Sequence, residues 1–241
     1  MKTITELQEL ADKIDNLIKT TINSNNSETF PILDGIIDIN KYFNCKFKIL
    51  WILKEPYDEF DENGEPCGGG WRTADAINSK TTIQDFTGGR PTFEPMIYTI
   101  WGILNEFNLW ENMDSVEDDP TMIDALKSIA YINVKKLPGH TTSPKSIIEN
   151  AYISSKEILL RQITDYNPDI IIGGSTLHHF FNDLGFKREE MVKHKSLNYI
   201  IKDNKIYIDA YHPAQRTNST GVTKQQYCND IINAVKVWAL K

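Results

Sequence analysis

Residues 168–174 read Pro-Asp-Ile-Ile-Ile-Gly-Gly, and this short stretch decides the fold class. Its three isoleucines are bounded by proline on one side and by two glycines on the other, which is typical of a strand buried on both faces. We therefore expect a strand over 169–172. Helices are expected on both sides of it, over 147–166 and over 175–182, and the hydroxyl of Ser175 is expected to cap the second helix.

The same alternation of strands and helices extends along the rest of the chain. A long loop is expected over 54–89, after a strand that is expected over 47–53. Strands that alternate with helices predict an α/β sandwich around a mostly parallel sheet. The remaining expected helices span 4–22, 93–107, 122–130 and 224–239, and the remaining expected strands span 130–134, 198–201 and 206–210.

The composition is that of an ordinary globular protein. The chain has 241 residues, of which 40% are hydrophobic and 24% charged, so it can bury a sizeable core. We expect a single domain over 1–241 with an N-terminal helical extension at about 1–25, acting as a monomer. No apolar run reaches the roughly 18 residues of a membrane helix, and no signal peptide is expected. Three cysteines, an odd number, argue against a disulfide framework and favour a reduced, cytoplasmic location.

The charge is unevenly distributed along the chain. The net charge of −7 disfavours a nucleic-acid partner when it is taken globally. Residues 1–124, however, carry −13 and residues 125–241 carry +6. The second half can therefore present a basic face, although charges that only decorate solvated surfaces explain the same pattern.

Polar and aromatic side chains follow the expected strands where ligands bind in parallel sheets, at the carboxyl ends. Glu55 can orient a water or stabilise a cationic transition state, and His212 can donate a hydrogen bond to a leaving group that becomes anionic. Asn133 offers one donor and one acceptor to a base edge. The candidates for stacking on a flat ring are Phe93, Tyr57 and Trp71.

Taken singly, each of these residues has an ordinary structural explanation, such as a loop carboxylate for Glu55 or a turn for Asn133. Their expected convergence on one edge of the sheet favours a functional site. No metal or cofactor is expected. The histidines lack zinc spacing, no Cys-x-x-Cys pair is present, and the glycine pairs match neither a phosphate loop, a dinucleotide fingerprint nor a nucleophile elbow.

Five motifs, in this order, resemble those of the uracil-DNA glycosylase superfamily. Residues 53–57, Leu-Lys-Glu-Pro-Tyr, resemble its first motif, Gly-Gln-Asp-Pro-Tyr. Residues 89–93, Gly-Arg-Pro-Thr-Phe, are similar to the Gly-Arg-Pro-Phe segment of the iron–sulfur branch, and residues 131–139 resemble its Thr-Asn-Val-Val-Lys-x-Arg-Pro-Pro segment. Residues 160–173 look like the helix-to-strand segment of that branch. Residues 211–214, Tyr-His-Pro-Ala, resemble the closing His-Pro-Ser motif.

The resemblance implies a three-layer α/β/α sandwich with a central, mostly parallel four-stranded sheet. It also implies a DNA repair enzyme that flips a damaged base out of DNA and hydrolyses its N-glycosidic bond. By position, Glu55 would assist the attack of water on the sugar carbon, and His212 would stabilise the departing uracil anion. Asn133 would read the uracil edge, Phe93 would stack on the base, and Tyr57 would exclude the methyl group of thymine.

The resemblance alone assigns roles to several further residues. Lys54 and Pro56 belong to the first motif and are expected to bind substrate. Gln215 and Arg216 occupy the position of the wedge that fills the vacated base stack. The residues implied to contact the DNA backbone are Lys135, Lys136, Lys145, Ser175 and the Thr/Ser loop 141–144.

The chain departs from the family pattern in ways that leave other functions open. Glu55 stands in place of aspartate, Ala214 in place of serine, and the cysteines of the iron–sulfur branch are missing, so no iron–sulfur cluster is expected. Two alternatives are therefore kept. One is a non-catalytic nucleic-acid or nucleobase binding protein on the same fold, and the other is a hydrolase of free nucleosides or nucleotides.

Overall fold

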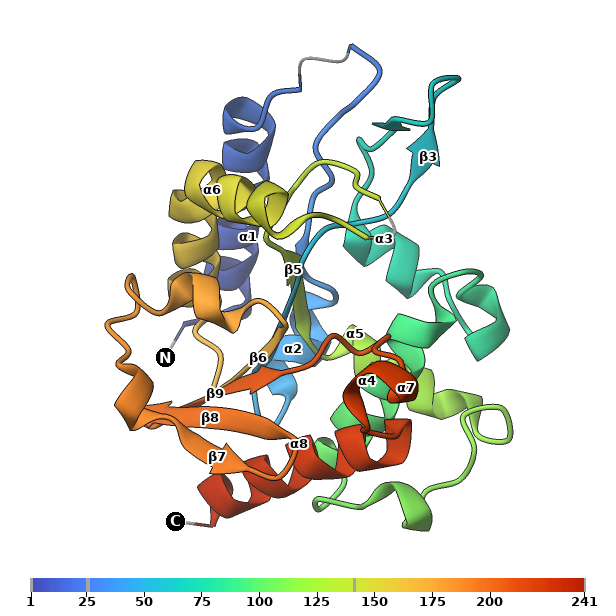
Figure 1. Cartoon of the computed structure of the whole chain (residues 1–241), viewed down its shortest axis with the longest axis vertical. Helices are drawn as coiled ribbons and strands as arrows, with labels where there is room; N and C mark the ends of the chain where they lie inside the picture. The colour runs from blue at the N-terminus through green and yellow to red at the C-terminus, as the bar shows by residue number, and fades with distance from the viewer. Residues whose placement is uncertain (1, 25–26, 141, 241) are drawn as a thin grey trace.

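The computed structural model describes residues 2–24, 27–140 and 142–240. Its centre is a mixed sheet of seven strands in the order β1-β5-β2-β6-β9-β8-β7 (Figure 1). The strands of this sheet are β1 (Gly35–Ile36), β2 (Ile49–Leu53), β5 (Ala130–Asn133), β6 (Ile170–Gly174), β7 (Val192–His194), β8 (Leu197–Lys202) and β9 (Lys205–Ala210).

Parallel pairing is confined to the middle of this sheet. The neighbours β5, β2, β6 and β9 pair in parallel, whereas β1, β8 and β7 pair antiparallel with their neighbours. The sheet is therefore larger than the four-stranded sheet that the resemblance implies. The added strands β1 and β7 escaped the sequence analysis because they are two and three residues long, too short for a periodic pattern.

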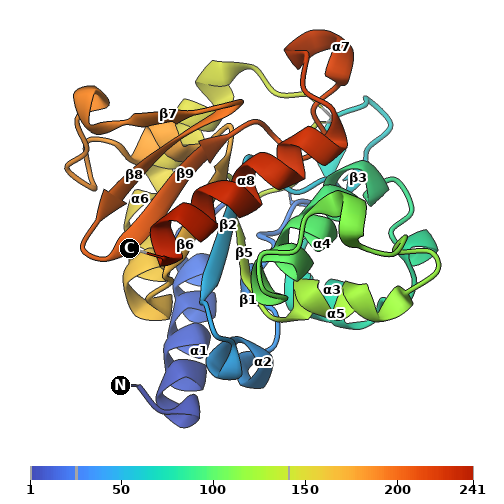
Figure 2. The ribbon, with the colours of Figure 1, turned by 90° about the horizontal axis from the view of Figure 1, so that it is seen from below.

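Helices cover both faces of the sheet, which explains why β2 and β6 are buried along their whole length. Successive residues of a strand point to opposite faces. Accordingly, Trp51 packs in a core with α4 (Arg90–Leu104) and α8 (Lys224–Ala239). Ile52 packs in the other core with α1 (Ile4–Thr21) and α6 (Lys145–Tyr166). Figure 2 shows α8 crossing over the strands, with α1 and α6 behind them.

Most of the expected helices are present. The helices expected over 4–22, 93–107, 147–166 and 224–239 correspond to α1, α4, α6 and α8. A capping box between Thr3 and Glu6 fixes the start of α1. No helix in the described part of the chain combines the length and the apolarity needed to cross a bilayer. The shorter helices are α2 (Ile39–Asn44), α3 (Thr73–Asn78), α5 (Asp124–Lys127) and α7 (Thr217–Thr220), with 3-10 turns η1 (Ile83–Asp85), η2 (Trp110–Asn112), η3 (Pro120–Ile123), η4 (Leu177–Phe180) and η5 (Arg188–Glu190).

Three local expectations were wrong. The segment 122–130 is not one helix but ends η3 and passes through the single turn α5 before entering β5. The segment 54–89 is not only loop, because it contains the hairpin β3 (Glu59–Phe60) and β4 (Pro66–Cys67), followed by α3 and η1. Ser175 does not cap a helix: it has a left-handed φ of 61°, and the 3-10 turn η4 follows it instead.

Candidate functional site

The carboxyl ends of the four parallel strands meet at one edge of the sheet. The pairing of β2 with β5 continues beyond both strands, since the N–H groups of Val134 and Lys135 donate to the carbonyls of Leu53 and Lys54 at 2.9 and 2.8 Å. On the other side of β2, a Cβ added to Gly174 would collide with the side chain of Leu53 and approach the strand end at 212–213. This close approach brings the ends of β2, β6 and β9 together.

The Glu55 side chain is nearly buried at this edge. It is 6% exposed, and its Oε2 lies 3.2 Å from the ammonium of Lys135. Lys135 also donates to the carbonyl of Pro138 at 2.7 Å. On the other side, Gly139 leaves no room for a Cβ, because that atom would collide with the carboxylate of Glu55. The position of the Glu55 carboxylate therefore depends on glycine at position 139.

His212 is held as a neutral imidazole with a defined proton position. Its Nδ1 accepts a hydrogen bond from the N–H of Ala214 at 3.2 Å, and its own backbone N–H donates to Oγ of Ser175 at 3.0 Å. Burial, together with the positive charge of the nearby Lys54, lowers the pKa of His212 to about 4. Because Nδ1 acts as an acceptor, the geometry assigns the proton of the neutral ring to Nε2.

Asn133 is buried at the end of β5 with part of its hydrogen-bonding capacity unused. Its Oδ1 lies 3.4 Å from the hydroxyl of Tyr131, which can donate to it. Its Nδ2 is buried and has no partner among the described residues. A buried donor without a partner is costly, but Asn133 is 0% exposed, so a ligand reaches this amide group only when the side chains that cover it move.

Phe93 lies near Asn133, in the first turn of α4. Its ring is 6.0 Å from that of Tyr131, which also contacts Asn133, and 4.8 Å from that of Phe86. Tyr57 is 59% exposed and pairs with Gly139 at the outer side of the edge. Trp71 does not join them, since its Nε1 donates to Asp58 at 2.8 Å below the β3–β4 hairpin.

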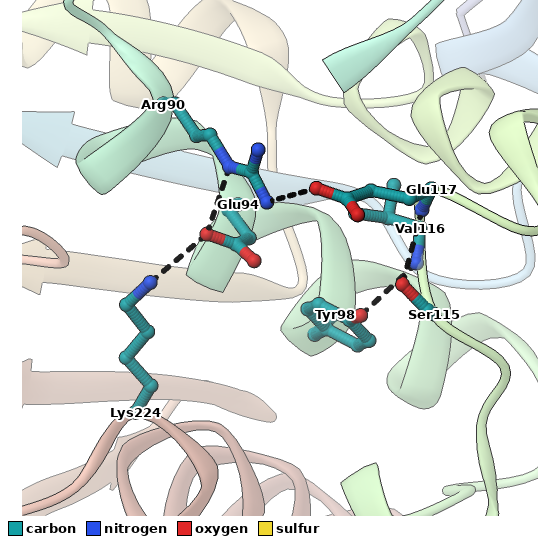
Figure 3. A network of polar contacts seen from close by, with 7 residues as sticks. All are labelled: Arg90, Glu94, Tyr98, Ser115, Val116, Glu117 and Lys224. Carbon is teal, nitrogen blue, oxygen red and sulfur yellow. Dashed lines mark hydrogen bonds and ion pairs between the residues drawn. The ribbon is translucent and has the colours of Figure 1, made fainter. Parts of the chain in front are cut away.

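Ion pairs fix the start of α4 and with it the position of Phe93 (Figure 3). Glu94 accepts from Lys224 at 2.9 Å and from Arg90 at 3.5 Å, and Arg90 also binds Glu117 at 2.6 Å. Partial burial would raise the pKa of Glu94, but Lys224 and Arg90 outweigh it and lower this pKa. The first turn of α4 is thereby tied to α8.

A buried polar network that the sequence analysis missed lies behind Asn133. Asp34, just before β1, accepts from the ammonium of Lys136 at 2.6 Å and from the backbone N–H of Asn133 at 2.7 Å. Gln162 of α6 donates to Asp34 at 2.9 Å and accepts from Lys136 at 2.9 Å. Burial lowers the pKa of Lys136, and Asp34 opposes this effect.

This network removes Lys136 from the set of residues expected to contact phosphates. Its side chain is 0% exposed, so its ammonium cannot reach a polynucleotide backbone. The reason is the partner Asp34, which is distant in sequence and cannot be recognised from a local motif. Lys136 instead helps to hold Asp34, which binds the backbone of Asn133.

The other expected DNA contacts lie around the edge of the sheet. Lys145 is exposed and pairs with Glu149 at 3.4 Å. Gln215 is tied back to the chain, since its Nε2 donates to the carbonyl of Val222 at 2.7 Å, whereas Arg216 is exposed just before α7. Within the loop 141–144, Thr141 lies outside the described residues.

The described residues contain no group of three or more histidine, cysteine or acidic side chains that could hold a metal ion. Cys45, Cys67 and Cys228 are all free.

No protein-family model matches this chain, and no curated protein matches its sequence. Function is therefore argued from the geometry of the site and from the resemblance of its motifs.

Proposed function

We propose that this protein is a uracil-DNA glycosylase-like hydrolase, which cleaves the N-glycosidic bond of uracil or a related damaged base in DNA. The observation that carries the proposal is the presence, at the same edge of the sheet, of a nearly buried carboxylate and a neutral imidazole. Glu55 supplies the first, and His212, with its proton on Nε2, supplies the second. Such a pair matches the two charges that separate when a glycosidic bond breaks.

The chemistry needs only water and these two side chains. Water adds to C1′ of the deoxyribose while the bond from C1′ to the base nitrogen breaks, and the electron pair of that bond leaves with the base. The Glu55 carboxylate orients the water, accepts its proton and stabilises positive charge on the sugar. The Nε2–H of His212 donates to the oxygen on which the negative charge of the base develops.

The neighbouring residues would select and hold the base. The free Nδ2 of Asn133 can donate to a carbonyl oxygen of uracil, and the remaining acceptor capacity of its Oδ1 can take the ring N–H. Phe93 would stack on the ring from the α4 side, and Tyr57, whose backbone pairs with Gly139, would exclude the methyl group of thymine, as the resemblance implies. The base must leave the helical stack to reach them.

On this proposal, one part of the fold is shared with the superfamily and another part is an addition to it. The four parallel strands β5, β2, β6 and β9, with helices on both faces, correspond to the three-layer sandwich of the superfamily. The strands β1, β7 and β8 extend this sheet at its two edges. The N-terminal helix α1 covers one face beside α6, since the two helices share a core.

The test is base release from an oligonucleotide with a single uracil, offered single-stranded and opposite guanine or adenine, followed by alkaline cleavage of the abasic site. We expect cleavage by the wild-type protein and a loss of about 100-fold or more in Glu55→Gln and in His212→Ala. Glu157→Gln, which removes an exposed carboxylate of α6, is the matched control and should keep full activity. Full activity in both site variants would refute the site, and no release by the folded wild-type protein would refute the function.

One observation favours a second candidate, a non-catalytic nucleobase or nucleic-acid binder. The Glu55 carboxylate is engaged by Lys135 at 3.2 Å, which competes with its use as a base toward water. A binder would retain salt-dependent affinity for the same oligonucleotides and release no base. Lys135→Met separates the two candidates, because freeing Glu55 should change the rate of an enzyme and leave a binder inactive.

A further inference from the structure

Three exposed aromatic rings form a continuous strip beside the candidate site. The ring centroids of Tyr57 and Phe60 are 5.5 Å apart, and those of Phe60 and His140 are 5.6 Å apart. Tyr57 is 59% exposed, Phe60 38%, and the side chain of His140 40%. We call these three residues the aromatic strip.

The aromatic strip starts close to Glu55. Tyr57 follows Glu55 by two residues and pairs with Gly139, the residue whose missing side chain makes room for the Glu55 carboxylate. His140 comes directly after Gly139. A chain of flat ligand groups with one group at Glu55 would therefore have its next group over these rings.

The hairpin that carries Phe60 is anchored to the rest of the protein. A two-stranded hairpin is marginally stable by itself. Here Asp58 accepts from the N–H of Gly69 at 2.6 Å and from Nε1 of Trp71 at 2.8 Å, which ties both ends of the hairpin to the segment before α3. Figure 1 shows the hairpin of β3 projecting beyond the end of the sheet.

The charges around Glu55 differ between its two sides. The hairpin is acidic, with exposed carboxylates at Glu59, Glu62 and Glu65, so it disfavours phosphate groups. The β6 side of β2 carries more basic than acidic groups, because Lys145, Lys54 and Arg188 act electrostatically on the imidazole of His178 and only Glu149 opposes them. A polynucleotide strand fits this distribution of charge when its phosphates lie on the β6 side and its bases turn toward the rings.

We propose that the aromatic strip stacks an unpaired nucleobase adjacent to the base held at Glu55, which makes single-stranded or locally opened polynucleotide the preferred ligand. Bases in a duplex already stack on their neighbours and cannot offer a free face to Phe60. This inference rests on the proposed function, because it takes the ligand at Glu55 to be a nucleotide within a strand.

The experiment measures binding without turnover. The probe is a fluorescently labelled oligonucleotide with one central 2′-fluoro-deoxyuridine, whose glycosidic bond resists hydrolysis, used as a single strand and as a duplex. We expect Phe60→Ala to raise the Kd for the single strand by about 5- to 30-fold, since stacking on an aromatic ring contributes strongly to such binding. The Kd for the duplex should change by less than twofold, and Phe60→Trp should bind the single strand at least as well as the wild type. Ile153→Ala, an exposed apolar position on α6 that is 73% exposed, is the matched control.

Several results would overturn the proposal. One is a single-strand Kd in Phe60→Ala that lies within twofold of the wild-type value, and another is full retention of affinity in Phe60→Leu. A third is a wild-type protein that binds the duplex as well as it binds the single strand, or that binds neither. The uracil-release assay, run in parallel, keeps the two proposals distinguishable. Base release with an unchanged Kd in Phe60→Ala rejects only the aromatic strip, whereas Phe60-dependent binding without base release rejects only the hydrolase.

Discussion

Replacing Asp34 by asparagine tests the buried network behind the site. Oδ1 of Asp34 accepts from Lys136 at 2.6 Å and from Gln162 at 2.9 Å, and Oδ2 accepts from the backbone N–H of Asn133 at 2.7 Å. An asparagine of the same shape keeps only one oxygen. It therefore turns an N–H group toward at least one of these donors and leaves the ammonium of Lys136 without an opposite charge.

The size of the effect follows from two routes open to Lys136. If it stays charged, breaking a buried ion pair costs about 3–5 kcal/mol. If it releases its proton instead, the cost is set by the difference between the pH and its ordinary pKa of 10.5, at about 1.36 kcal/mol per unit. That cost is about 5 kcal/mol at pH 7 and about 2 kcal/mol at pH 9. We expect Asp34→Asn to lose about 3–5 kcal/mol of unfolding free energy at pH 7 and about 2 kcal/mol at pH 9.

The sign of this pH dependence follows from the protons bound. The folded variant has released the proton of Lys136 while the unfolded chain still holds it, so the stability of the variant rises with pH. Urea denaturation at both pH values, followed by tryptophan fluorescence and by circular dichroism, measures the effect. Glu149→Gln removes an exposed carboxylate paired with Lys145 and should change stability by less than about 0.5 kcal/mol. A loss below about 1 kcal/mol in Asp34→Asn at pH 7, or a loss that does not shrink by pH 9, would refute the reasoning.

Three further perturbations have defined outcomes. Gly139→Ala should displace the Glu55 carboxylate and lower the rate of base release about 100-fold with little change in melting temperature; an unchanged rate would show that the carboxylate position is not critical. Because the pKa of His212 is lowered, its contribution to stability should be constant above about pH 6.5 and should decrease as the pH falls from about 6.5 to 4. His212→Gln should weaken this pH dependence of the melting temperature. The same slope in both proteins would contradict the assignment. Asp58→Ala should free the hairpin and speed its cleavage by limited proteolysis, with a loss of about 1–3 kcal/mol because Trp71 loses its acceptor; an unchanged cleavage rate would contradict the anchoring role.

The sequence was informative where local pattern and tertiary environment agree. The isoleucines of β6 are buried on both faces, and a run of such residues between proline and glycine has few other uses. The amphipathic spacing of 224–239 matches α8 at both ends, because Thr223 caps its first turn. The strand ends could be located for the same reason, and with them Glu55, Asn133 and His212.

The sequence was uninformative where a residue depends on a distant partner. Lys136 looks like a surface lysine until Asp34, about a hundred residues earlier, is seen to hold it. Serine is a residue type that often caps helices, but the hydroxyl of Ser175 instead accepts a hydrogen bond from the backbone N–H of His212. In both cases the decisive contact joins two strands that are neighbours only in the folded sheet, and neither local propensity nor periodicity contains that information.

The order of the strands has a consequence for how the chain must be made. β6, with its three consecutive isoleucines, is the middle strand, and three strands lie on each side of it. The two edges of the sheet are the short strands β1 and β7, which offer few free backbone groups to another molecule. During synthesis, however, β6 leaves the ribosome about thirty residues before β9, so its open side is uncovered for that interval. For that interval a strand with three consecutive isoleucines is itself an unprotected edge, so slow translation across this stretch should lower the yield of folded protein.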